Sequence, residues 1–350
     1  MRNWSCTGSR RRGASVSTAT VIARRVAVGG GRRSPQGKGR RAMRVGFIGL
    51  GNMGAAAARN VRRAGFELFV HDIRREAGQA LEAEGATWCA SPAEMVSAVD
   101  VVMSMVFGPA QIEQVMRGPG GLLEGDCNGK VWIDLTTSTP ALMRELGVQF
   151  AAAGGSAVDA PVTGSIDSCI RGDMILFVGG DDAVIAGVQP VLDAVGLTRR
   201  VGGHGNGYVA KLVNNQLWFI HAAAIGEAMV AAKVAGLEPD VWWAAMEGGA
   251  AESFVMRHDV PSIFAGHYDP SFRLALCLKD LGLIDDLLDE VGTRAELTRA
   301  AHARFAEAAE RYGDGAGEMT VCKVIEDDAG VELRVSGDWV APWEVRHPGE

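Results

Sequence analysis

The stretch "RVGFIGLGNMGAAAARNVRRAGFELFVHD", residues 44–72, decides the fold of this chain. Residues 44–50 form an apolar run that is typical of a buried strand and leads directly into glycines. The alanine-rich segment that follows is predicted to be a helix closed by Gly65, because its apolar positions are spaced by three and four. Residues 67–71 predict a second strand. A strand, a helix and a strand in immediate succession predict a βαβ unit.

The glycines of this stretch match the pattern G-x-G-x-x-G between the strand and the helix. The matching residues are Gly49, Leu50, Gly51, Asn52, Met53 and Gly54. The first glycine allows a tight turn, the second lets the backbone approach a pyrophosphate, and the third lets the helix pack closely on the strand. The helix N-terminus then offers free N–H groups to phosphates. We therefore predict that this loop binds a dinucleotide; the alternative is a tight turn without a ligand.

The residue that ends the second strand bears on the choice of dinucleotide. Asp72 is placed to accept hydrogen bonds from an adenosine ribose, and its carboxylate disfavours the 2′-phosphate of NADP. This favours NAD. Arg74 and Arg75 follow closely and would accommodate that phosphate, so NADP stays open as the alternative cofactor.

The rest of the chain predicts an α/β region followed by a helical one. Further buried strands are expected at 100–106, 130–135, 156–162 and 174–180, and helices at 206–235, 239–247, 252–264, 274–290 and 292–312. Helical patterns lie between most of the strands, which predicts a Rossmann domain with a mostly parallel, doubly wound sheet. The expected divisions are a leader at 1–42, the Rossmann domain at 43–204, an all-helical domain at 205–327 that opens with a long connecting helix, and a tail at 328–350.

Charge is distributed unevenly along the chain. Residues 1–42 hold eleven basic and no acidic side chains, whereas the other 308 residues hold 24 basic and 42 acidic ones. An acidic body argues against nucleic acid as the main partner. The leader is expected to be largely disordered. Three interpretations of it compete: a transit peptide, a nucleic-acid-binding arm, or sequence joined by a start assigned upstream of Met43.

Cysteine usage and hydropathy indicate the cellular compartment and the kinds of partner to expect. The six cysteines lie far apart and form no C-x-x-C pair, which favours a reducing compartment, without a disulfide framework or a cysteine zinc site. No apolar run approaches the ~18 residues that read as a membrane span, so no membrane partner is expected. No grouping of His, Cys, Asp and Glu has metal-ligand spacing. The expected location is the cytoplasm, or the mitochondrial matrix if the leader is a transit peptide.

Four later segments carry a family resemblance together with the glycine loop. They are "IDLTTSTP" (133–140), "DAPVTGS" (159–165), "KLVNN" (211–215) and "FRLALCLKDLGL" (272–283). In this order they resemble the β-hydroxyacid dehydrogenases, the group that contains 3-hydroxyisobutyrate dehydrogenase and tartronate semialdehyde reductase. The resemblance covers residues 43 to about 327. It implies an NAD(P)-dependent oxidoreductase that moves a hydride between nicotinamide and a small β-hydroxy acid or its semialdehyde. It also implies a homodimer or homotetramer with the active site between the two domains.

The resemblance assigns roles to individual residues. Lys211 and Asn215 take the catalytic places. A substrate carboxylate would be bound by Thr136, Thr163, Gly164, Ser165 and Asn215, and the cofactor by residues 49–54, Asp72, Val106, Phe107 and Lys279. The chain departs from the family pattern at positions that cluster around the substrate loop and the cofactor edge. Threonines stand for usual serines at 136 and 163, Ser165 replaces a glycine, Ser168-Cys169 replaces Gly-Ala, Asp173 replaces a threonine, and Val106-Phe107 replaces Leu-Pro.

The chemistry of the lysine helix agrees with this assignment. Lys211 and Asn215 are four residues apart in an apolar helical pattern, so they share one face. A lysine can exchange the substrate hydroxyl proton if its pKa falls from ~10.4 toward neutrality through burial and neighbouring charge. Asn215 would hold the substrate hydroxyl or orient the lysine. The alternative is a solvated helix lysine without a chemical role.

Other functions remain as alternatives. An imine reductase, or another reductase acting on a different substrate, shares the fold, but imine reductases typically lack the lysine. A 6-phosphogluconate dehydrogenase would show Lys-x-x-His-Asn, where this chain has Lys-Leu-Val-Asn-Asn. A non-catalytic dinucleotide-binding module is the third alternative, which turnover would exclude.

Overall fold

The computed structural model describes residues 43–341 and residue 344. The leader at 1–42 therefore lies outside the described residues, and so do the last residues of the tail. The chain divides into two units, residues 1–41 and residues 42–350, and everything described below belongs to the second unit.

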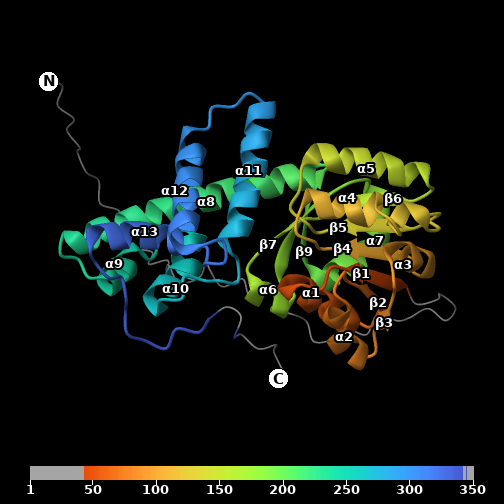
Figure 1. Ribbon diagram of the computed structural model, residues 1–350, viewed down its shortest axis with the longest axis horizontal. Coiled ribbons are helices and arrows are strands. Elements are labelled where there is room, and N and C mark those ends of the chain that lie inside the picture. The colour runs from red at the N-terminus through yellow and green to blue at the C-terminus, as the bar shows by residue number, and fades with distance from the viewer. Residues whose placement is uncertain (1–42, 342–343, 345–350) are drawn as a thin grey trace, which may run out of the picture. The chain divides into compact units, whose positions relative to one another are not determined.

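A mixed, mostly parallel sheet forms the first half of this unit (Figure 1). Its strands are β1 (Arg44–Ile48), β2 (Glu67–His71), β3 (Thr87–Trp88), β4 (Val101–Ser104), β5 (Val131–Asp134), β6 (Ser156–Asp159), β7 (Val162–Thr163), β8 (Met174–Gly179) and β9 (Gly196–Gly202). The order is β3-β2-β1-β4-β5-β6-β8-β7, with β9 paired to β8. The first six strands run parallel, whereas β8 is antiparallel to β6 and β7. The expected Rossmann-type fold is confirmed.

Helices cover both faces of the sheet because side chains alternate along each strand. Val101 and Met103 pack into one core, with α1 (Asn52–Arg63), α6 (Ile166–Arg171) and α7 (Asp182–Val195). Val102 points into the other core, with α3 (Pro92–Ala98), α4 (Pro109–Arg117) and α5 (Pro140–Ala152). The period of two puts neighbouring residues of a strand on opposite faces. The remaining short helical segments of this half are η1 (Arg75–Gly78), α2 (Gln79–Ala83) and η2 (Leu122–Glu124).

The sequence prediction was wrong at three places in the sheet. The single strand expected at 156–162 is divided into β6 and β7, and Pro161 stands at the break, where its missing N–H could not serve a ladder. Strand β3 is only two residues long, too short to leave a periodic signal. Strand β9, "GLTRRVG", carries two arginines and gives no apolar pattern.

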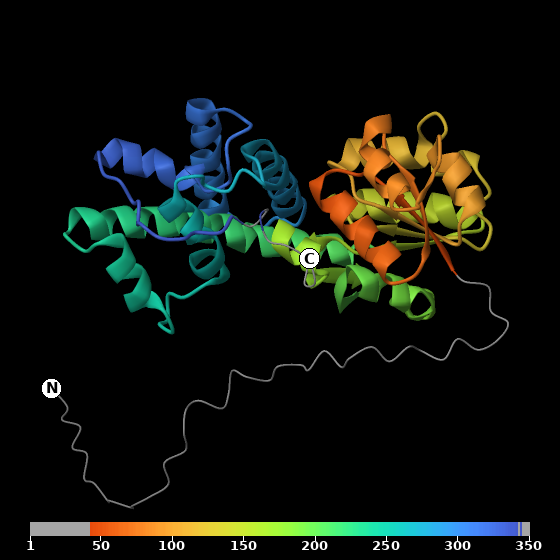
Figure 2. The same cartoon turned by 90° about the horizontal axis from the view of Figure 1, so that it is seen from below.

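The second half of the unit is helical around its own core. Its elements are α8 (Asn206–Val234), α9 (Pro239–Met246), the π-helical turn η3 (Val255–Asp259), α10 (Val260–Ala265), α11 (Leu274–Glu290), α12 (Glu296–Tyr312) and α13 (Thr320–Ala329). Helix α8 runs from the sheet into this half, where it contacts α11, α12 and α13 (Figure 2). The helix expected at 252–264 is present as the π turn η3 continued directly by α10, whereas α13 was not expected. Residues 331–341 form neither helix nor strand.

By length and composition alone, α8 could cross a membrane. An 18-residue window of it has a mean hydropathy of 1.4, although the helix contains no continuous apolar run of ~18 residues. The core helix of a soluble protein has the same length and composition. Polar side chains, among them Lys211 and Asn215, interrupt the apolar pattern of α8.

Two buried carboxylates fix the first turn of α8 to the sheet. Asp159, at the end of β6, accepts hydrogen bonds from the backbone N–H groups of Gly205 at 3.0 Å and Gly207 at 2.6 Å. Asp134, at the end of β5, accepts a hydrogen bond from the Tyr208 hydroxyl. A carboxylate at a helix N-terminus satisfies free N–H groups and complements the helix dipole. The start of α8 is thereby held at the carboxyl edge of the parallel strands, where ligands bind in open α/β sheets.

This anchor predicts that Gly207 does not tolerate a side chain. A Cβ there would lie 2.4 Å from the Phe177 carbonyl oxygen and 2.5 Å from Asp159 Oδ2. We expect Gly207→Ala to cost roughly 1–3 kcal/mol, as overpacking does, and to lower the unfolding temperature. Gly187→Ala is the matched control, because it is also a helical glycine but has no atom within 4 Å of its Cβ position. It should leave stability unchanged or raise it by about 0.5–1 kcal/mol. Equal effects of the two substitutions in thermal unfolding would contradict the anchor.

Candidate active site

The glycine loop has the geometry that each glycine requires. Gly49 has φ +92°, and a Cβ there would lie 2.2 Å from the Met105 carbonyl oxygen, so only glycine fits this turn. At Gly54 a Cβ would lie 2.0 Å from the Gly49 carbonyl oxygen, which reflects the close packing of α1 on the turn. At Gly51, by contrast, a Cβ would meet nothing within 4 Å, so the backbone there borders open space. The middle glycine thus leaves room for a ligand.

The N-terminus of α1 fits the phosphates of a dinucleotide. Its N-cap residue Gly51 makes no side-chain capping bond, and the first turn contains no acidic residue. Gly51 and Asn52 are exposed. Free N–H groups at the positive end of a helix bind anions. The loop from Gly49 to Gly54 is therefore a suitable cradle for the pyrophosphate of NAD(P).

Asp72 is held in place beside this loop. Its Oδ2 accepts a hydrogen bond from the Leu50 N–H at 2.8 Å, and its Oδ1 accepts one from the Arg74 N–H at 2.8 Å. The Arg74 guanidinium Nε lies 3.2 Å from the same Oδ1. Burial raises the pKa of Asp72, but the bonds from Leu50 and Arg74 outweigh it and leave the pKa below its usual value. Asp72 is thus an anion at neutral pH. Arg75 instead pairs with Glu82 and lies over Trp88.

Thr136 belongs to a buried network at the end of β5. Its hydroxyl donates to Asp134 Oδ1 at 3.0 Å and accepts from the Val106 N–H at 3.1 Å, and the residue is 2% exposed. Ser104 and Tyr208 also donate to Asp134, whose pKa burial raises to about 6. Thr136 therefore uses its hydroxyl inside the protein, where it fixes the loop after β4. This placement weighs against the direct substrate contact that the sequence predicts for Thr136.

Lys211 lies on α8 one turn beyond the anchored end. It is half-buried, and among the described residues its ammonium has no hydrogen-bond or ion-pair partner. Burial and the positive charge of Lys279 lower the pKa of Lys211 to about 8, against the opposing charges of Asp280 and Glu318. An unpaired lysine with a pKa near neutrality is suited to exchanging a proton.

Polar side chains connect Lys211's helix to α11. Asn215 is buried, and its Nδ2 donates to Asp280 Oδ2 at 2.7 Å. Lys279 Nζ lies 2.6 Å from Asp280 Oδ1 and 3.5 Å from the Thr137 carbonyl oxygen after β5. The Lys279 ammonium also lies 5.7 Å from the centre of the Phe107 ring, in the loop after β4. The structure thus brings Lys279 to the edge of the sheet where Val106 and Phe107 were expected to meet the cofactor.

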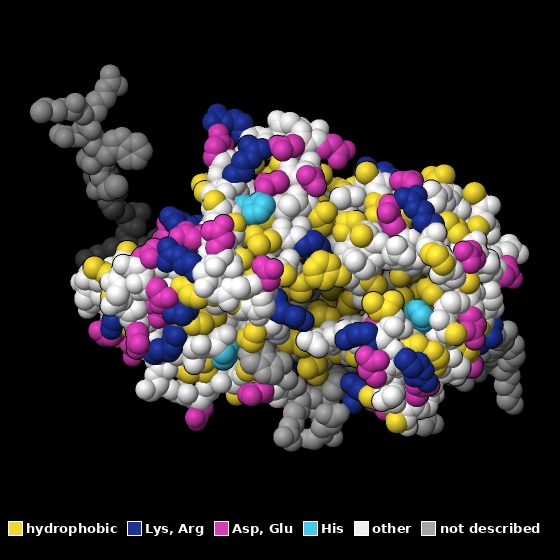
Figure 3. Space-filling view, viewed as in Figure 1, with side chains coloured by type: hydrophobic (Ala, Val, Ile, Leu, Met, Phe, Trp, Pro, Cys, Tyr) yellow, Lys and Arg dark blue, Asp and Glu magenta, His cyan; other side chains and the backbone are white. Residues whose placement is uncertain are grey.

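The predicted substrate loop contacts the same face of α8. Thr163 Oγ1 accepts a hydrogen bond from Asn214 Nδ2 at 3.1 Å, and Asn214 also donates to Asn215 Oδ1. Gly164 has φ +119° and a Cβ there would lie 3.0 Å from Ser168 Cβ, so glycine is required. Ser165 turns instead to His258 of η3, whose Nε2 lies 2.9 Å from Ser165 Oγ. Figure 3 shows apolar side chains between the sheet and the helical half on this face, with Lys and Arg side chains beside them.

Several residues of this site were missed in the sequence. Asn214 adjoins a predicted residue and gave no separate signal. Asp280 lies in the segment 272–283 that carries the resemblance, but no role was assigned to it. His258 and Asp259 lie in η3, inside the helix expected at 252–264, and Glu318 lies in the loop before α13. No short motif marks them, because their proximity is created by tertiary packing.

The fold and the site define the class of protein. A mostly parallel sheet with a pyrophosphate loop, together with a lysine of lowered pKa at its carboxyl edge, is the arrangement of a nicotinamide-dependent oxidoreductase. Residues 44–203 match the family described as the NAD binding domain of 6-phosphogluconate dehydrogenase. Residues 205–325 match the family described as NAD-binding of NADP-dependent 3-hydroxyisobutyrate dehydrogenase. The chain belongs to the β-hydroxyacid dehydrogenase family and is an NAD(P)-dependent oxidoreductase acting on a CH–OH group, as the motifs indicated.

Named relatives agree with this assignment. L-threonate dehydrogenase of Cupriavidus necator is 33% identical over 291 residues, which is 83% of this chain and 97% of the relative. 2-Hydroxy-3-oxopropionate reductase of Escherichia coli is 33% identical over 242 residues, 69% of this chain and 82% of the relative. The crystal structure of 3-hydroxyisobutyrate dehydrogenase from Salmonella typhimurium is 29% identical with a TM-score of 0.73, and the match covers 81% of this chain and 99% of that one.

Imine reductases are more distant. The imine reductase of Myxococcus stipitatus is 18% identical with a TM-score of 0.53, a likeness that shows the shared fold alone. The alternative of an imine reductase is therefore less well supported than the hydroxyacid dehydrogenase.

Proposed function

We propose that this protein interconverts a small β-hydroxy acid and its semialdehyde or keto form, with Lys211 as the proton acceptor and donor. The observation that carries the proposal is the Lys211 side chain, which is half-buried, has no hydrogen-bond or ion-pair partner within residues 43–341, and has a pKa lowered to about 8. It lies one helical turn from Asn214, which holds the predicted substrate loop through Thr163. A proton-exchanging group and a substrate loop on one helix face make a site for alcohol oxidation.

The role proposed for each residue follows from its contacts. Bound nicotinamide supplies the hydride acceptor or donor. Neutral Lys211 takes the hydroxyl proton during oxidation, and its ammonium returns a proton during reduction. Asn215, oriented by Asp280, holds the reacting hydroxyl. The backbone N–H groups of Gly164 and Ser165, with the Thr163 hydroxyl, bind the substrate carboxylate. In this proposal residues 43–204 bind the cofactor, and residues 205–327 complete the substrate site.

For the cofactor we propose NAD in preference to NADP. The ionised Asp72 carboxylate stands beside the glycine loop, where it would repel a 2′-phosphate and accept hydrogen bonds from ribose hydroxyls. Arg74 is engaged with that carboxylate and Arg75 with Glu82, so neither arginine is left unpaired for a phosphate.

The test is turnover followed by absorbance of reduced nicotinamide. We expect wild type to oxidise short hydroxy acids, or to reduce their semialdehydes, faster with NAD(H) than with NADP(H). Lys211→Met should lower kcat by at least ~10²-fold, because it removes the proton-exchanging group. Lys233→Met is the matched control, since Lys233 lies on the same helix but pairs with Glu238 at the surface. It should keep wild-type turnover.

Two results would contradict this assignment. Lys211→Met with undiminished turnover would remove the lysine from the chemistry. Wild type that binds NAD but turns over no hydroxy acid or semialdehyde would favour the non-catalytic binding module.

We also propose that the protein is a homodimer or homotetramer that uses α8. Val213 and Leu217 are 43% and 54% exposed, and the exposed Ala224 and Ala228 continue the same side of the helix. An exposed apolar stripe of this kind marks an association surface. Leu217→Glu should therefore lower the mass measured by light scattering to that of the monomer. Val291→Glu, at an exposed apolar site outside α8, should not. A wild-type protein that is monomeric in solution would contradict the proposed association through α8.

The location that agrees with this function is the cytoplasm, or the mitochondrial matrix if residues 1–42 are cleaved as a transit peptide. N-terminal sequencing of the protein from its native source decides between them. A mature chain that begins near Met43 in a mitochondrial fraction would indicate the matrix.

A further inference from the structure

Helix α6 contacts the glycine loop on one side and the helical half of the unit on the other. On the side of the glycine loop, the buried Cys169 thiol donates to the Met53 carbonyl oxygen at 3.2 Å. Burial raises the pKa of this thiol to about 12, so it keeps its proton and can donate. Asn60 Nδ2 of α1 donates to the Cys169 carbonyl oxygen at 2.7 Å. Helix α6 is therefore bonded to the helix whose first turn faces the cofactor phosphates.

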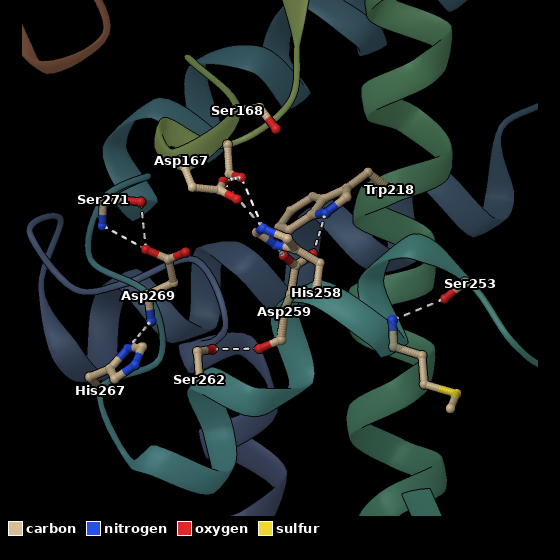
Figure 4. A network of polar contacts seen from close by, with 12 residues as sticks. Asp167, Ser168, Trp218, Ser253, His258, Asp259, Ser262, His267, Asp269 and Ser271 are labelled. Atoms are coloured by element: carbon tan, nitrogen blue, oxygen red, sulfur yellow. Dashed lines mark hydrogen bonds and ion pairs between the residues drawn. The ribbon is translucent and has the colours of Figure 1, made fainter. Parts of the chain in front are cut away.

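Polar side chains join the other side of α6 to the π-helical turn η3 (Figure 4). His258 Nε2 lies 2.9 Å from Oγ of Ser165, the N-cap residue of α6, and 3.4 Å from Asp167 Oδ1. The other ring nitrogen, Nδ1, lies 2.6 Å from Asp259 Oδ1. Asp259 Oδ2 in turn accepts a hydrogen bond from Trp218 Nε1 of α8 at 2.8 Å. These contacts run without a break from α6 through η3 to α8.

His258 is a cation between two carboxylates. Burial lowers the pKa of its imidazole, but the bonds to Asp167 and Asp259 outweigh this and raise the pKa to about 10. Both ring nitrogens therefore carry protons and donate at neutral pH. Asp259 is 3% exposed, and a buried charge that loses its partner is strongly destabilising. The link between α6 and η3 is therefore a firm one.

Helix α6 depends on its contacts because it is short. It has only the six residues Ile166–Arg171, and isolated helices of fewer than ~12–15 residues are marginal in water. Arg171 ties the end of the helix to its beginning, since its Nη1 donates to Asp167 Oδ2 at 2.6 Å. The remaining support comes from α1 on one side and η3 on the other. Loosening either contact therefore weakens the order on which the other contact depends.

Two of the contact residues stand where the chain departs from the family pattern. Ser165 replaces a glycine, and Cys169 replaces an alanine. Neither glycine nor alanine has a side chain that can form a hydrogen bond. Ser168 is a third departure, and its hydroxyl accepts a hydrogen bond from Arg171 Nη2 at 3.0 Å. These substitutions add polar contacts within α6 and on both of its sides.

We propose that α6 couples the cofactor site to the helical half, so that NAD(P) bound at the glycine loop stabilises η3. A dinucleotide on the first turn of α1 restricts the backbone at Met53, to which Cys169 is bonded. A more ordered α6 then keeps Asp167 in place for His258. His258 is a positioning residue, because it touches neither cofactor nor reacting atoms in this scheme. The inference depends on cofactor binding and not on the substrate or the proton transfer proposed above.

Amide hydrogen exchange with and without bound cofactor tests this coupling, because exchange reports local opening of the structure. The cofactor is NAD or NADP, whichever binds more tightly in calorimetry. At a free concentration of about 100 times its Kd, it favours the state that binds it by ~10²-fold, and we expect at least ~10-fold slower exchange in residues 253–265 of wild type.

Variants on the two sides of α6 should interrupt the effect at different places. His258→Ala should keep the slower exchange in α6 but leave less than ~2-fold in η3. It should also weaken cofactor binding by at least ~5-fold, because a coupling between two sites is reciprocal. Cys169→Ala should reduce the effect in α6 and in η3 together, because it loosens the first contact of the series. A purely structural defect would not separate α6 from η3 in this way.

Two control variants match these substitutions. His302→Ala removes a histidine that also bonds a carboxylate, but its partner Asp285 lies within the helical half. Cys322→Ala removes a buried thiol that also donates to a backbone carbonyl, but that carbonyl belongs to Ala222 of α8. Both controls should keep the wild-type response of η3 to the cofactor.

The outcomes separate this inference from the proposed function. Exchange in η3 that does not respond to the cofactor in wild type overturns the coupling and leaves the dehydrogenase intact. Slower exchange in η3 that persists at wild-type strength in either His258→Ala or Cys169→Ala also overturns it, as does an equal loss in the two controls. If His258→Ala does not fold, Ser165→Gly restores the usual family residue and should weaken the response of η3. An undiminished response in that variant would then overturn the coupling.

Discussion

The anchoring of the first turn of α8 by Asp159 and Asp134 is the constraint on which the rest of the site depends. Asp159 at the end of β6 bonds two backbone N–H groups of that turn, and Asp134 at the end of β5 bonds Tyr208. A carboxylate in this position stabilises a helix end by about 0.3–1 kcal/mol, and by up to ~2 when partly buried. Its larger effect is positional. Because α8 is one continuous helix, fixing its start also fixes Lys211 and Asn215 over the carboxyl edge of the sheet, where the glycine loop lies.

The electrostatics of the site follow from this placement. Lys211 is poorly solvated and stands near Lys279, so its ammonium is disfavoured, while Asp280 and Glu318 keep its pKa from falling further. Glu318 is buried, and burial together with the charges of Asp259 and Asp269 raises its own pKa well above the usual value. Asp280 carries more of this balance, and it also orients Asn215 and pairs with Lys279. The Asp280 carboxylate thus interacts with Lys211, Asn215 and Lys279 at once.

The sequence predicted the parts of this site that are local in the chain. The glycine loop, Asp72 and the lysine face are visible because each occupies a few consecutive residues or one helical period. The strand at 67–71 and the helix at 274–290 have the bounds that the sequence indicated. The sequence could not place Thr136, because hydroxyls that face a substrate and hydroxyls that bond a buried Asp134 look alike in a motif. Nor could it find His258, whose partner Ser165 lies 93 positions earlier in the chain.

The role of Lys211 as proton acceptor is tested most directly by the pH dependence of hydroxy-acid oxidation. This is measured in wild type, Asp280→Asn and Asp285→Asn. Wild-type kcat should rise with pH to a plateau with a midpoint at about 8, because only neutral Lys211 accepts the proton. Asp280→Asn should move the midpoint to lower pH, since the charge of Asp280 raises the pKa of Lys211. Asp285→Asn, on the same helix but paired with His302, should leave it in place. A rate independent of pH between about 6.5 and 9.5, or a midpoint that both variants share with wild type, would contradict the assignment of the proton to Lys211.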